Sequence, residues 1–268
     1  MTAPALVLVA HGTRSTRGVE MIAALAEAVS LELSTRASRE SGAAGVVTAA
    51  HECRAVRGEP MMAAPVVRTA FVDVLGPSPS EVLRDLEATA GSVPAVVVPA
   101  FLASGYHVYQ DVPREVEESN HPSVSVTPAM GPDPALARIM TMRLRAVGQR
   151  PGDAVVFAAA GSSDARARED VRRSAALLAE HLGAPVRIGY VATGAPRVPD
   201  VVADLRASGA RRVFIASYLL AHGLFQQRLH EAGADGVADP IGAHPAVVRL
   251  IADRYHTAAR ESTRVRVL

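Results

Sequence analysis

Three polar side chains follow apolar runs in the first half of this chain and have apolar counterparts in the second half. His11 ends the run LVLVA, Asp73 follows AFV, and His107 lies in the segment PAFLASGYHVYQD. Each of these segments has a second, similar copy: VVFAAAGSSD (155–164), IGYVATGAP (188–196) and ASYLLAHGLFQQR (216–228). The aligned positions of the second copy hold Ala160, Ala192 and Leu224. Polar groups that only one copy keeps indicate one active site that faces an inert partner copy.

Two imidazoles and a carboxylate are the groups that divalent metal or proton-transfer chemistry requires. Nitrogen and oxygen ligands suit Fe²⁺, Co²⁺ or Ni²⁺. A neutral imidazole can equally accept a proton near pH 7. We therefore predict His11, Asp73 and His107 as the catalytic residues, and their types leave both roles open.

Charged and small residues follow the His-Gly turn and accompany the second histidine. Arg14 and Arg17 lie at the expected start of a helix, where guanidinium groups and free N–H groups can bind an anion. A solvated helix start is the alternative. The predicted ligand contacts are the residues beside the two histidines, namely Gly12, Thr13, Arg14, Gly105 and Tyr106.

Short apolar runs alternate with amphipathic stretches in both copies, which predicts parallel sheets flanked by helices. The expected strands are 6–10, 66–74, 95–101, 154–159, 186–191 and 212–218. The expected helices are 19–33, 80–88, 133–147, 170–182, 198–208 and 244–258, with Ser78 or Ser80 as a helix cap. Functional loops lie at the carboxyl ends of parallel strands, which is where the three polar residues fall.

The fold class that follows is α/β, with two similar domains produced by internal duplication. We expect a first domain over 1–132, a second over 150–268, and a helix over 133–149 that links or crosses between them. The predicted active site lies in the cleft between the domains. His222, in the second copy, is a candidate to face that cleft from the other side.

The first copy carries an insertion. His11 and Ala160 are 149 positions apart, whereas Asp73 and Ala192 are 119 apart, so the first copy has 30 extra residues between these motifs. The stretch 35–65 is rich in Ala, Gly and charge, and it predicts an inserted loop. Within it, His51-Glu52-Cys53 could bind a metal, although a loop without a ligand is the better interpretation.

Composition excludes several classes of protein. All 28 basic residues are Arg, so there is no Schiff-base or P-loop lysine, and the single cysteine excludes a four-cysteine metal site. The net charge is +1 without a basic stripe, which argues against nucleic acid as a partner. No apolar run approaches the ~20 residues that span a membrane. We expect a cytoplasmic protein, monomeric or homodimeric, that does not bind membranes.

The segments LVLVAHGTRSTRG, AFVDVLGPSPSEVL and VVVPAFLASGYHVYQDVP resemble the sirohydrochlorin chelatases that work without ATP. The pair GPDPALARIMTMRL and GAHPAVVRLIADRY extends the resemblance over nearly the whole chain except the insertion. Its most specific parts are the HG[ST]R strand end and the G-x-H-x-x-x-D-[IV]-P loop. Members of that family commonly have Glu where Asp73 stands and an acidic residue where Gly76 stands.

The resemblance implies insertion of Fe²⁺ or Co²⁺ into sirohydrochlorin, for siroheme or cobalamin synthesis. It assigns metal handling to His11 and His107, with the metal as substrate and no tightly bound cofactor. Two alternatives stay open: a non-catalytic carrier of tetrapyrrole or metal, and a ferrochelatase for another porphyrin. A histidine phosphatase is the weakest rival, because Ala10 stands where that class has its arginine.

Overall fold

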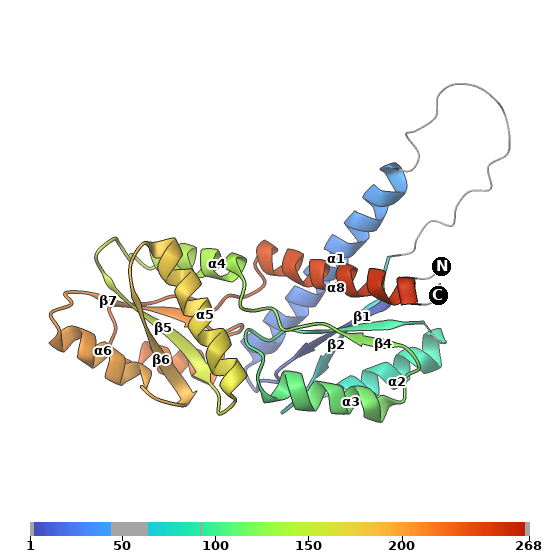
Figure 1. Ribbon diagram of the computed structural model, residues 1–268, viewed down its shortest axis with the longest axis horizontal. Helices are drawn as coiled ribbons and strands as arrows, with labels where there is room; N and C mark the ends of the chain where they lie inside the picture. Colours follow the sequence, from blue (N-terminus) through green and yellow to red (C-terminus); the bar gives the residue numbers. More distant parts are fainter. Residues whose placement is uncertain (1–2, 44–63, 92, 266–268) are drawn as a thin grey trace, which may run out of the picture.

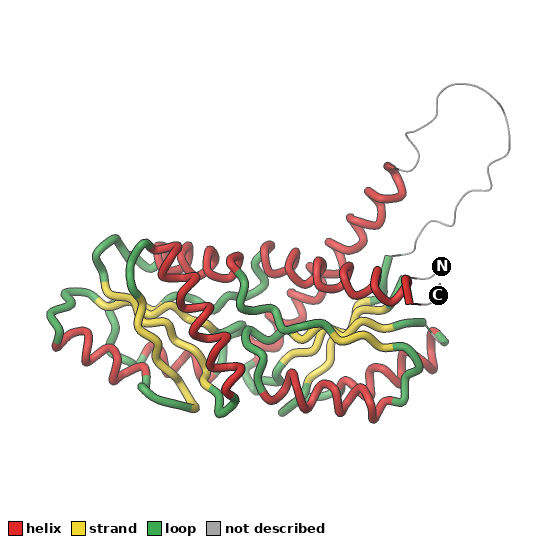
Figure 2. Tube along the Cα trace, viewed as in Figure 1, coloured by secondary structure: helices red, strands yellow, loops and turns green. Residues whose placement is uncertain are grey.

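The computed structural model describes residues 3–43, 64–91 and 93–265. They form two four-stranded parallel sheets, each flanked by helices (Figures 1 and 2). The first sheet has the order β2-β1-β3-β4 and the second the order β6-β5-β7-β8. We call β1–β4 with α1–α3 the first half, and β5–β8 with α5–α7 the second half. The α/β prediction is confirmed, and the repeated strand order shows the duplication.

The elements follow one another in the same order in both halves. The first sheet is built from β1 (Ala5–Ala10), β2 (Val67–Phe71), β3 (Ala95–Pro99) and β4 (Val124–Val126). The helices up to the middle of the chain are α1 (Thr16–Ala43), α2 (Pro79–Ala90), α3 (Val112–Ser119) and α4 (Pro134–Ala146), with a short π-helix, η1 (His107–Asp111), before α3. The second sheet is built from β5 (Ala154–Gly161), β6 (Val186–Thr193), β7 (Val213–Tyr218) and β8 (Gly236–Val237). The remaining helices are α5 (Ala165–Leu182), α6 (Val198–Ala207), α7 (Leu224–His230) and α8 (Pro245–Val265).

All six predicted strands and all six predicted helices are present, whereas β4, β8, η1, α3 and α7 were not predicted. Ser78 is the cap of α2: its side chain accepts from the Glu81 N–H, and the Glu81 carboxylate accepts from the Ser78 N–H. This reciprocal pair satisfies two N–H groups that the helix itself cannot. None of the helices within the described ranges is long and apolar enough to cross a membrane.

The strand register corrects one part of the internal alignment. Ala10 pairs with Phe71 and Ala159 with Tyr190, as the alignment of the first two motifs requires. Val9 pairs with Pro99, and the sequence alignment matches Pro99 with Ala216. However, Ala158, the counterpart of Val9, pairs with Ser217 instead of Ala216. The third motif is therefore shifted by one position. His107 corresponds to Phe225, and Tyr106 corresponds to Leu224.

Two further hydrogen bonds support this shift. The Met130 N–H donates to the Phe101 carbonyl, and in the second half the Ile241 N–H donates to the Leu219 carbonyl. Phe101 and Leu219 match under the corrected alignment. The predicted pairing of His107 with Leu224 was wrong by one residue. The conclusion that the second copy has no metal ligand at this position is unchanged, because the side chain of Phe225, like that of Leu224, cannot bind a metal.

The insertion begins with helix rather than loop. Helix α1 continues to Ala43, so the first residues of the stretch predicted as a loop extend it by more than two turns beyond Leu33. In Figure 1 this end of α1 projects away from the rest of the chain. The hydroxyl groups of Ser34 and Ser38, both within this extension, donate hydrogen bonds to the carbonyl oxygens four residues earlier. The segment His51-Glu52-Cys53 lies outside the described residues.

The last helix of each copy packs on the other copy's sheet. Helix α4 follows the first sheet in sequence but contacts α5 and β7, whereas α8 follows the second sheet but contacts α1, β3 and β4. Figure 1 shows α4 over the second sheet and α8 beside α1. The helix expected over 133–149 thus lies against the second half. This exchange ties the two halves together in both directions.

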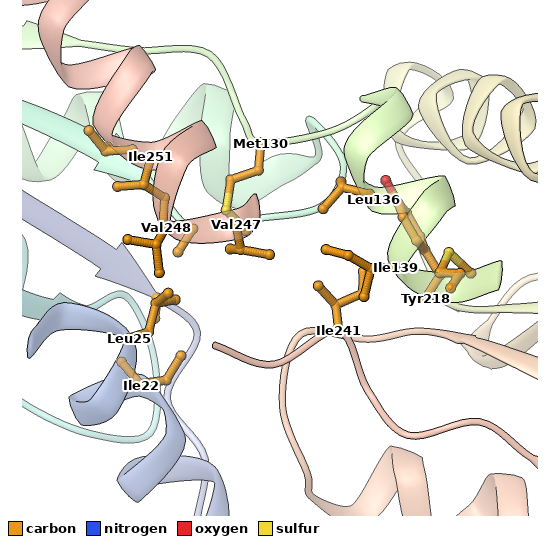
Figure 3. Packing of buried hydrophobic residues seen from close by; sticks show 14 of the residues in the cluster. Ile22, Leu25, Met130, Leu136, Ile139, Tyr218, Ile241, Val247, Val248 and Ile251 are labelled. Carbon is orange, nitrogen blue, oxygen red and sulfur yellow. The ribbon is translucent and has the colours of Figure 1, made fainter. Parts of the chain in front are cut away.

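A single apolar cluster runs through both halves along these exchanged helices. It includes Ile22 and Leu25 of α1, Val247 of α8 and Ile139 of α4, all almost fully buried. Figure 3 shows these side chains lining up from α1 past the start of α8 to α4. Burial of apolar area is the main stabilising contribution to folding, so this shared cluster resists separation of the halves. The strand ends that carry the polar residues are therefore held in fixed relation.

Candidate active site

His11 and His107 come from neighbouring strands and their rings meet. His11 is the first residue after β1, and His107 begins η1, eight residues after β3 ends. The ring centroids are 5.0 Å apart and the ring planes are nearly perpendicular, at 85°. The His11 side chain is 50% exposed and that of His107 is 34% exposed. Two residues 96 positions apart in the sequence thus form one accessible imidazole pair.

The hydrogen bond of His11 decides which of its nitrogens is open. Its Nδ1 lies 2.8 Å from the carbonyl oxygen of Gly12, and a carbonyl oxygen can only accept. Nδ1 therefore carries the hydrogen, and in the neutral ring Nε2 keeps its lone pair. This Nε2 lies 3.9 Å from Oδ2 of Asp73. That separation is too long for a direct hydrogen bond, so the lone pair remains available.

Asp73 is held beside His11 by a tight turn. The predicted strand to Val74 is too long: β2 ends at Phe71, and Asp73 lies in the following turn. Val74 has a φ of +67°, an unusual conformation for a β-branched residue. A Cβ on Gly12 would lie 1.8 Å from the Asp73 carbonyl oxygen, so only glycine fits there. Gly12 thus allows the two strand-end turns to approach.

His107 is oriented by a carboxylate that sequence reasoning did not assign. Its Nδ1 lies 2.6 Å from Oδ2 of Asp111, a residue that is only 7% exposed. Arg114 contacts the other carboxylate oxygen at 3.0 Å. A carboxylate accepts, so Nδ1–H of His107 donates and Nε2 is left open here as well. The i, i+4 spacing of His107 and Asp111 was the signal that could have revealed this pair.

His107 and Asp111 are the first and last residues of a π-helical turn. In η1 the Val112 N–H donates to the His107 carbonyl, five residues back. Side chains four positions apart lie on the same side of such a turn, as they do on an α-helix. Short π-helical segments occur frequently at functional sites. Phe101 stacks on the His107 ring at 5.9 Å, and the two contacts together restrict its rotation.

The second half lies directly against this site. The Ser104 N–H donates to the Asp170 carboxylate at 2.9 Å, and the Arg166 guanidinium lies 4.5 Å from the centroid of the Tyr109 ring. The Tyr218 hydroxyl donates to the Leu102 carbonyl at 2.6 Å. The loop that leads into His107 is therefore anchored by residues of the second half. This matches the expectation of a site where the two copies meet.

The other predicted ligand contacts surround the two histidines along the chain. Thr13 is half-buried and its Oγ1 accepts from the Ser15 N–H, while Arg14 and Arg17 are exposed at the start of α1. His222 lies beside Arg17: burial first, and then the Arg17 charge, hold the pKa of this histidine below its usual value. Gly105 is half-buried and Tyr106 is exposed.

No group of three or more His, Cys, Asp or Glu side chains within the described ranges is arranged to hold a metal ion. The histidine pair thus supplies two nitrogens without a third close protein ligand. A hollow of about 410 Å³ does exist elsewhere, lined by Arg36, Arg39, Asp253, His256, Thr257 and Arg260. It lies far from the histidines, since Arg36 is 20 residues along α1, which is about 30 Å of helix.

Known proteins share this sequence pattern and this fold. The sequence profile of the CbiX family matches residues 5–147 and 154–258. The chain is 23% identical over 211 residues to a sirohydrochlorin ferrochelatase of Priestia megaterium, covering 72% of this chain and 78% of that protein. It is 23% identical over 136 residues to a sirohydrochlorin cobaltochelatase of Methanothermobacter thermautotrophicus, covering 41% of this chain and 95% of that protein.

Solved structures show the same architecture. The structure of SirB from Bacillus subtilis with Fe³⁺ superposes with a TM-score of 0.73 and 22% identity, covering 97% of both chains. A cobalt complex of SirB from Bacillus subtilis subspecies spizizenii gives a TM-score of 0.67 at 21% identity, covering 97% of this chain and 96% of that one. At these identities the likeness concerns the fold. Because the family profile matches both copies and nearly the whole chain, this chain belongs to the CbiX family.

Proposed function

We propose that this chain inserts Fe²⁺ or Co²⁺ into sirohydrochlorin, with the metal as a substrate and without a tightly bound cofactor. The observation that carries the proposal is the pair of imidazoles whose Nδ1 atoms are both engaged, one by the Gly12 carbonyl and one by Asp111. Both Nε2 atoms are therefore open, on rings 5.0 Å apart. Membership of the CbiX family and the names of the two relatives support the choice of substrate.

The chemistry of metallation matches this pair. Metal insertion must strip water from a divalent ion and remove two protons from the pyrrole nitrogens. An imidazole Nε2 can bind such an ion, and a neutral imidazole can accept a proton at neutral pH. Because the described part of the chain has no group of three such ligands arranged for a metal ion, the histidine pair would hold the ion loosely enough to release it to the macrocycle. A closed site with four protein ligands would retain it.

Asp73 and Asp111 take different parts in this proposal. Asp73 is exposed and 3.9 Å from the His11 Nε2, so it can accept a proton from that ring through a small movement or one water. Asp111 is buried and bonded to Nδ1 of His107, so it orients the ring and keeps Nε2 open. We assign Asp73 a catalytic part and Asp111 a positioning part.

Cationic side chains lie where the carboxylates of the substrate would need them. Arg14 and Arg17 are exposed beside the His-Gly turn, and Arg166 of the second half lies over Tyr109. Guanidinium groups bind carboxylates in paired hydrogen bonds. Sirohydrochlorin carries many carboxylates, so these three residues are the proposed contacts for its side chains.

Anaerobic absorbance spectroscopy tests the proposal. The protein is mixed at catalytic concentration with sirohydrochlorin and either Co²⁺ or Fe²⁺, and the metallated product is followed against a protein-free control. Many turnovers per protein are expected. Spectral change limited to one equivalent would instead indicate a carrier. Protoporphyrin, with two carboxylates, is offered in competition: equal or faster metallation of this porphyrin would indicate a ferrochelatase with another substrate.

A further inference from the structure

The two halves contact each other through reciprocal loops next to the histidine pair. A Cβ on Gly105 of the first half would lie 3.5 Å from the Ala167 Cβ and 3.6 Å from the Ser162 Oγ of the second half. A Cβ on Gly223 of the second half would lie 3.4 Å from the Thr13 Oγ1 of the first half. Under the corrected alignment Gly105 matches Gly223, and Thr13 matches Ser162. The contact therefore occurs twice, once in each direction.

The residue after each of these glycines is apolar and exposed. Tyr106 follows Gly105, Leu224 follows Gly223, and both are 58% exposed. Gly223 approaches Thr13, which lies two residues after His11, so the loop that carries Leu224 lies against the His-Gly turn of the first half. Tyr106 belongs to the first half, and its ring centroid lies 6.2 Å from that of His107. The duplication thus gives each half one exposed apolar residue in a loop at the contact next to the histidine pair.

Two further exposed apolar residues lie next to the predicted site residues in the sequence. Ten large apolar residues within the described ranges are exposed, and Val74 and Tyr109 are among them. Val74 adjoins Asp73, and Tyr109 lies in η1 two residues after His107. Single exposed apolar side chains are normal on a protein surface and need no explanation. Exposed apolar side chains that cluster around polar reactive groups indicate a surface that a ligand covers.

We infer that Leu224 and Tyr106 form the two apolar contacts for the planar macrocycle, one from each half, and that Leu224 is a residue for substrate binding in the otherwise degenerate copy. This inference depends on the proposed function. The centre of a tetrapyrrole is a flat, apolar ring whose charges lie at its periphery. One exposed apolar side chain from each half, at the contact next to the histidine pair, suits that centre, while Arg166 over Tyr109 supplies positive charge at the edge.

The inference explains what the second copy contributes to the site. Its positions that match His11 and His107 are Ala160 and Phe225, so it lacks both members of the histidine pair. Phe225 packs into the second half's own core, whereas Leu224 is left exposed next to the first half. Leu224 thus gives this copy a part in binding that does not require metal ligands.

The substitution Leu224→Ala tests the inference, with Leu31→Ala as the matched control. Leu31 is 69% exposed on α1 and so is also a surface leucine. Binding of metal-free sirohydrochlorin is titrated anaerobically by absorbance, and Co²⁺ binding is titrated separately in the absence of tetrapyrrole. Leu224→Ala is expected to weaken tetrapyrrole binding by about five- to tenfold, as loss of apolar contact implies. Co²⁺ binding is expected to be unchanged, and Leu31→Ala is expected to behave as wild type.

The outcomes separate the inference from the proposed function. If the wild type turns over sirohydrochlorin and Leu224→Ala has unchanged affinity and KM, the inference is wrong and the proposed function stands. If Leu224→Ala loses Co²⁺ binding too, Leu224 acts on the histidine pair rather than on the macrocycle, and the inference is again wrong. A wild type that neither binds nor metallates sirohydrochlorin overturns both. The substitution Leu224→Phe, which keeps an apolar contact, should retain tetrapyrrole affinity.

Discussion

Asp111 offers a sharp test of how the site is positioned, because it touches His107 without being exposed to the substrate. We consider the substitution Asp111→Asn, which keeps the size of the side chain and removes its charge. In the structure Oδ2 of Asp111 accepts from Nδ1–H of His107 at 2.6 Å, and Arg114 contacts Oδ1 at 3.0 Å. An asparagine can turn its N–H group toward Nδ1, which would place the ring hydrogen on Nε2. That hydrogen would occupy the lone pair that the metal needs.

The size of the effect follows from the kind of bond lost. A hydrogen bond to a charged group contributes about 1.5–3 kcal/mol, against about 1 kcal/mol for a neutral one. Loss of the carboxylate partner of a metal-binding histidine commonly lowers metal affinity or activity by about 10- to 100-fold. We therefore expect Asp111→Asn to lower kcat for Co²⁺ insertion and the affinity for Co²⁺ by at least about tenfold. KM for the tetrapyrrole should change little.

The assay compares Asp111→Asn with a control variant, Glu118→Gln, which removes the charge of the second carboxylate that contacts Arg114. Glu118 contacts Arg114 at 3.7 Å and both side chains are exposed, so Glu118→Gln should leave kcat within about twofold. Initial rates are followed by absorbance under anaerobic conditions. Nuclear magnetic resonance of ¹⁵N-labelled histidine reports which ring nitrogen of His107 carries the hydrogen. Thermal unfolding of each variant shows whether the fold is retained.

Two results would refute this reasoning. One is a kcat and Co²⁺ affinity for Asp111→Asn equal to those of the wild type. The other is an unchanged nitrogen spectrum for His107 in that variant together with a large loss of kcat, since the loss would then have another cause.

Two further predictions concern the contact between the halves. A Cβ at Gly131 would lie 2.3 Å from both the Leu102 carbonyl oxygen and the Tyr218 hydroxyl. We therefore expect Gly131→Ala to lower the free energy of unfolding by about 1–3 kcal/mol, measured as a lower urea midpoint with an unchanged slope. An unchanged midpoint would contradict the close approach. His222 has a pKa lowered from 6.5, first by burial and then by Arg17, so the unfolded state binds its proton more readily and stability should fall as pH drops below 6.5. His222→Gln should lose less stability than the wild type between about pH 7.5 and about pH 5.5 in urea unfolding, and equal losses would show that this histidine does not titrate as described.

Much of the architecture was predictable because the chain repeats its pattern. Apolar runs such as Leu6–Ala10 are continuous and end in polar or glycine residues, which is typical of buried parallel strands. The loss of both histidines in the second copy indicated which half carries the reactive groups. Parallel strands present their carboxyl ends at one edge, so the approach of His11 and His107 followed from the topology.

Other features depend on tertiary structure and could not be predicted. The exchange of α4 and α8 between the sheets is decided by packing, because the amphipathic pattern of a helix shows which face is buried but not which sheet it packs on. The one-residue shift that pairs Tyr106 with Leu224 is already present in β3 and β7, where apolar residues of similar size align equally well at two positions. Asp111 was visible as a motif position. Its i, i+4 spacing from His107 was visible too, but the burial of its carboxylate and the π-helical form of the turn were not.

The central claim is that the imidazole pair of the first half binds the metal and delivers it to a tetrapyrrole. The most direct test is the anaerobic initial rate of Co²⁺ insertion into sirohydrochlorin for the wild type, His11→Ala and His107→Ala, with Co²⁺ affinity measured on the same samples. The account predicts that each substitution abolishes turnover and weakens Co²⁺ binding, while tetrapyrrole binding remains. Turnover at the wild-type rate in either variant would contradict it.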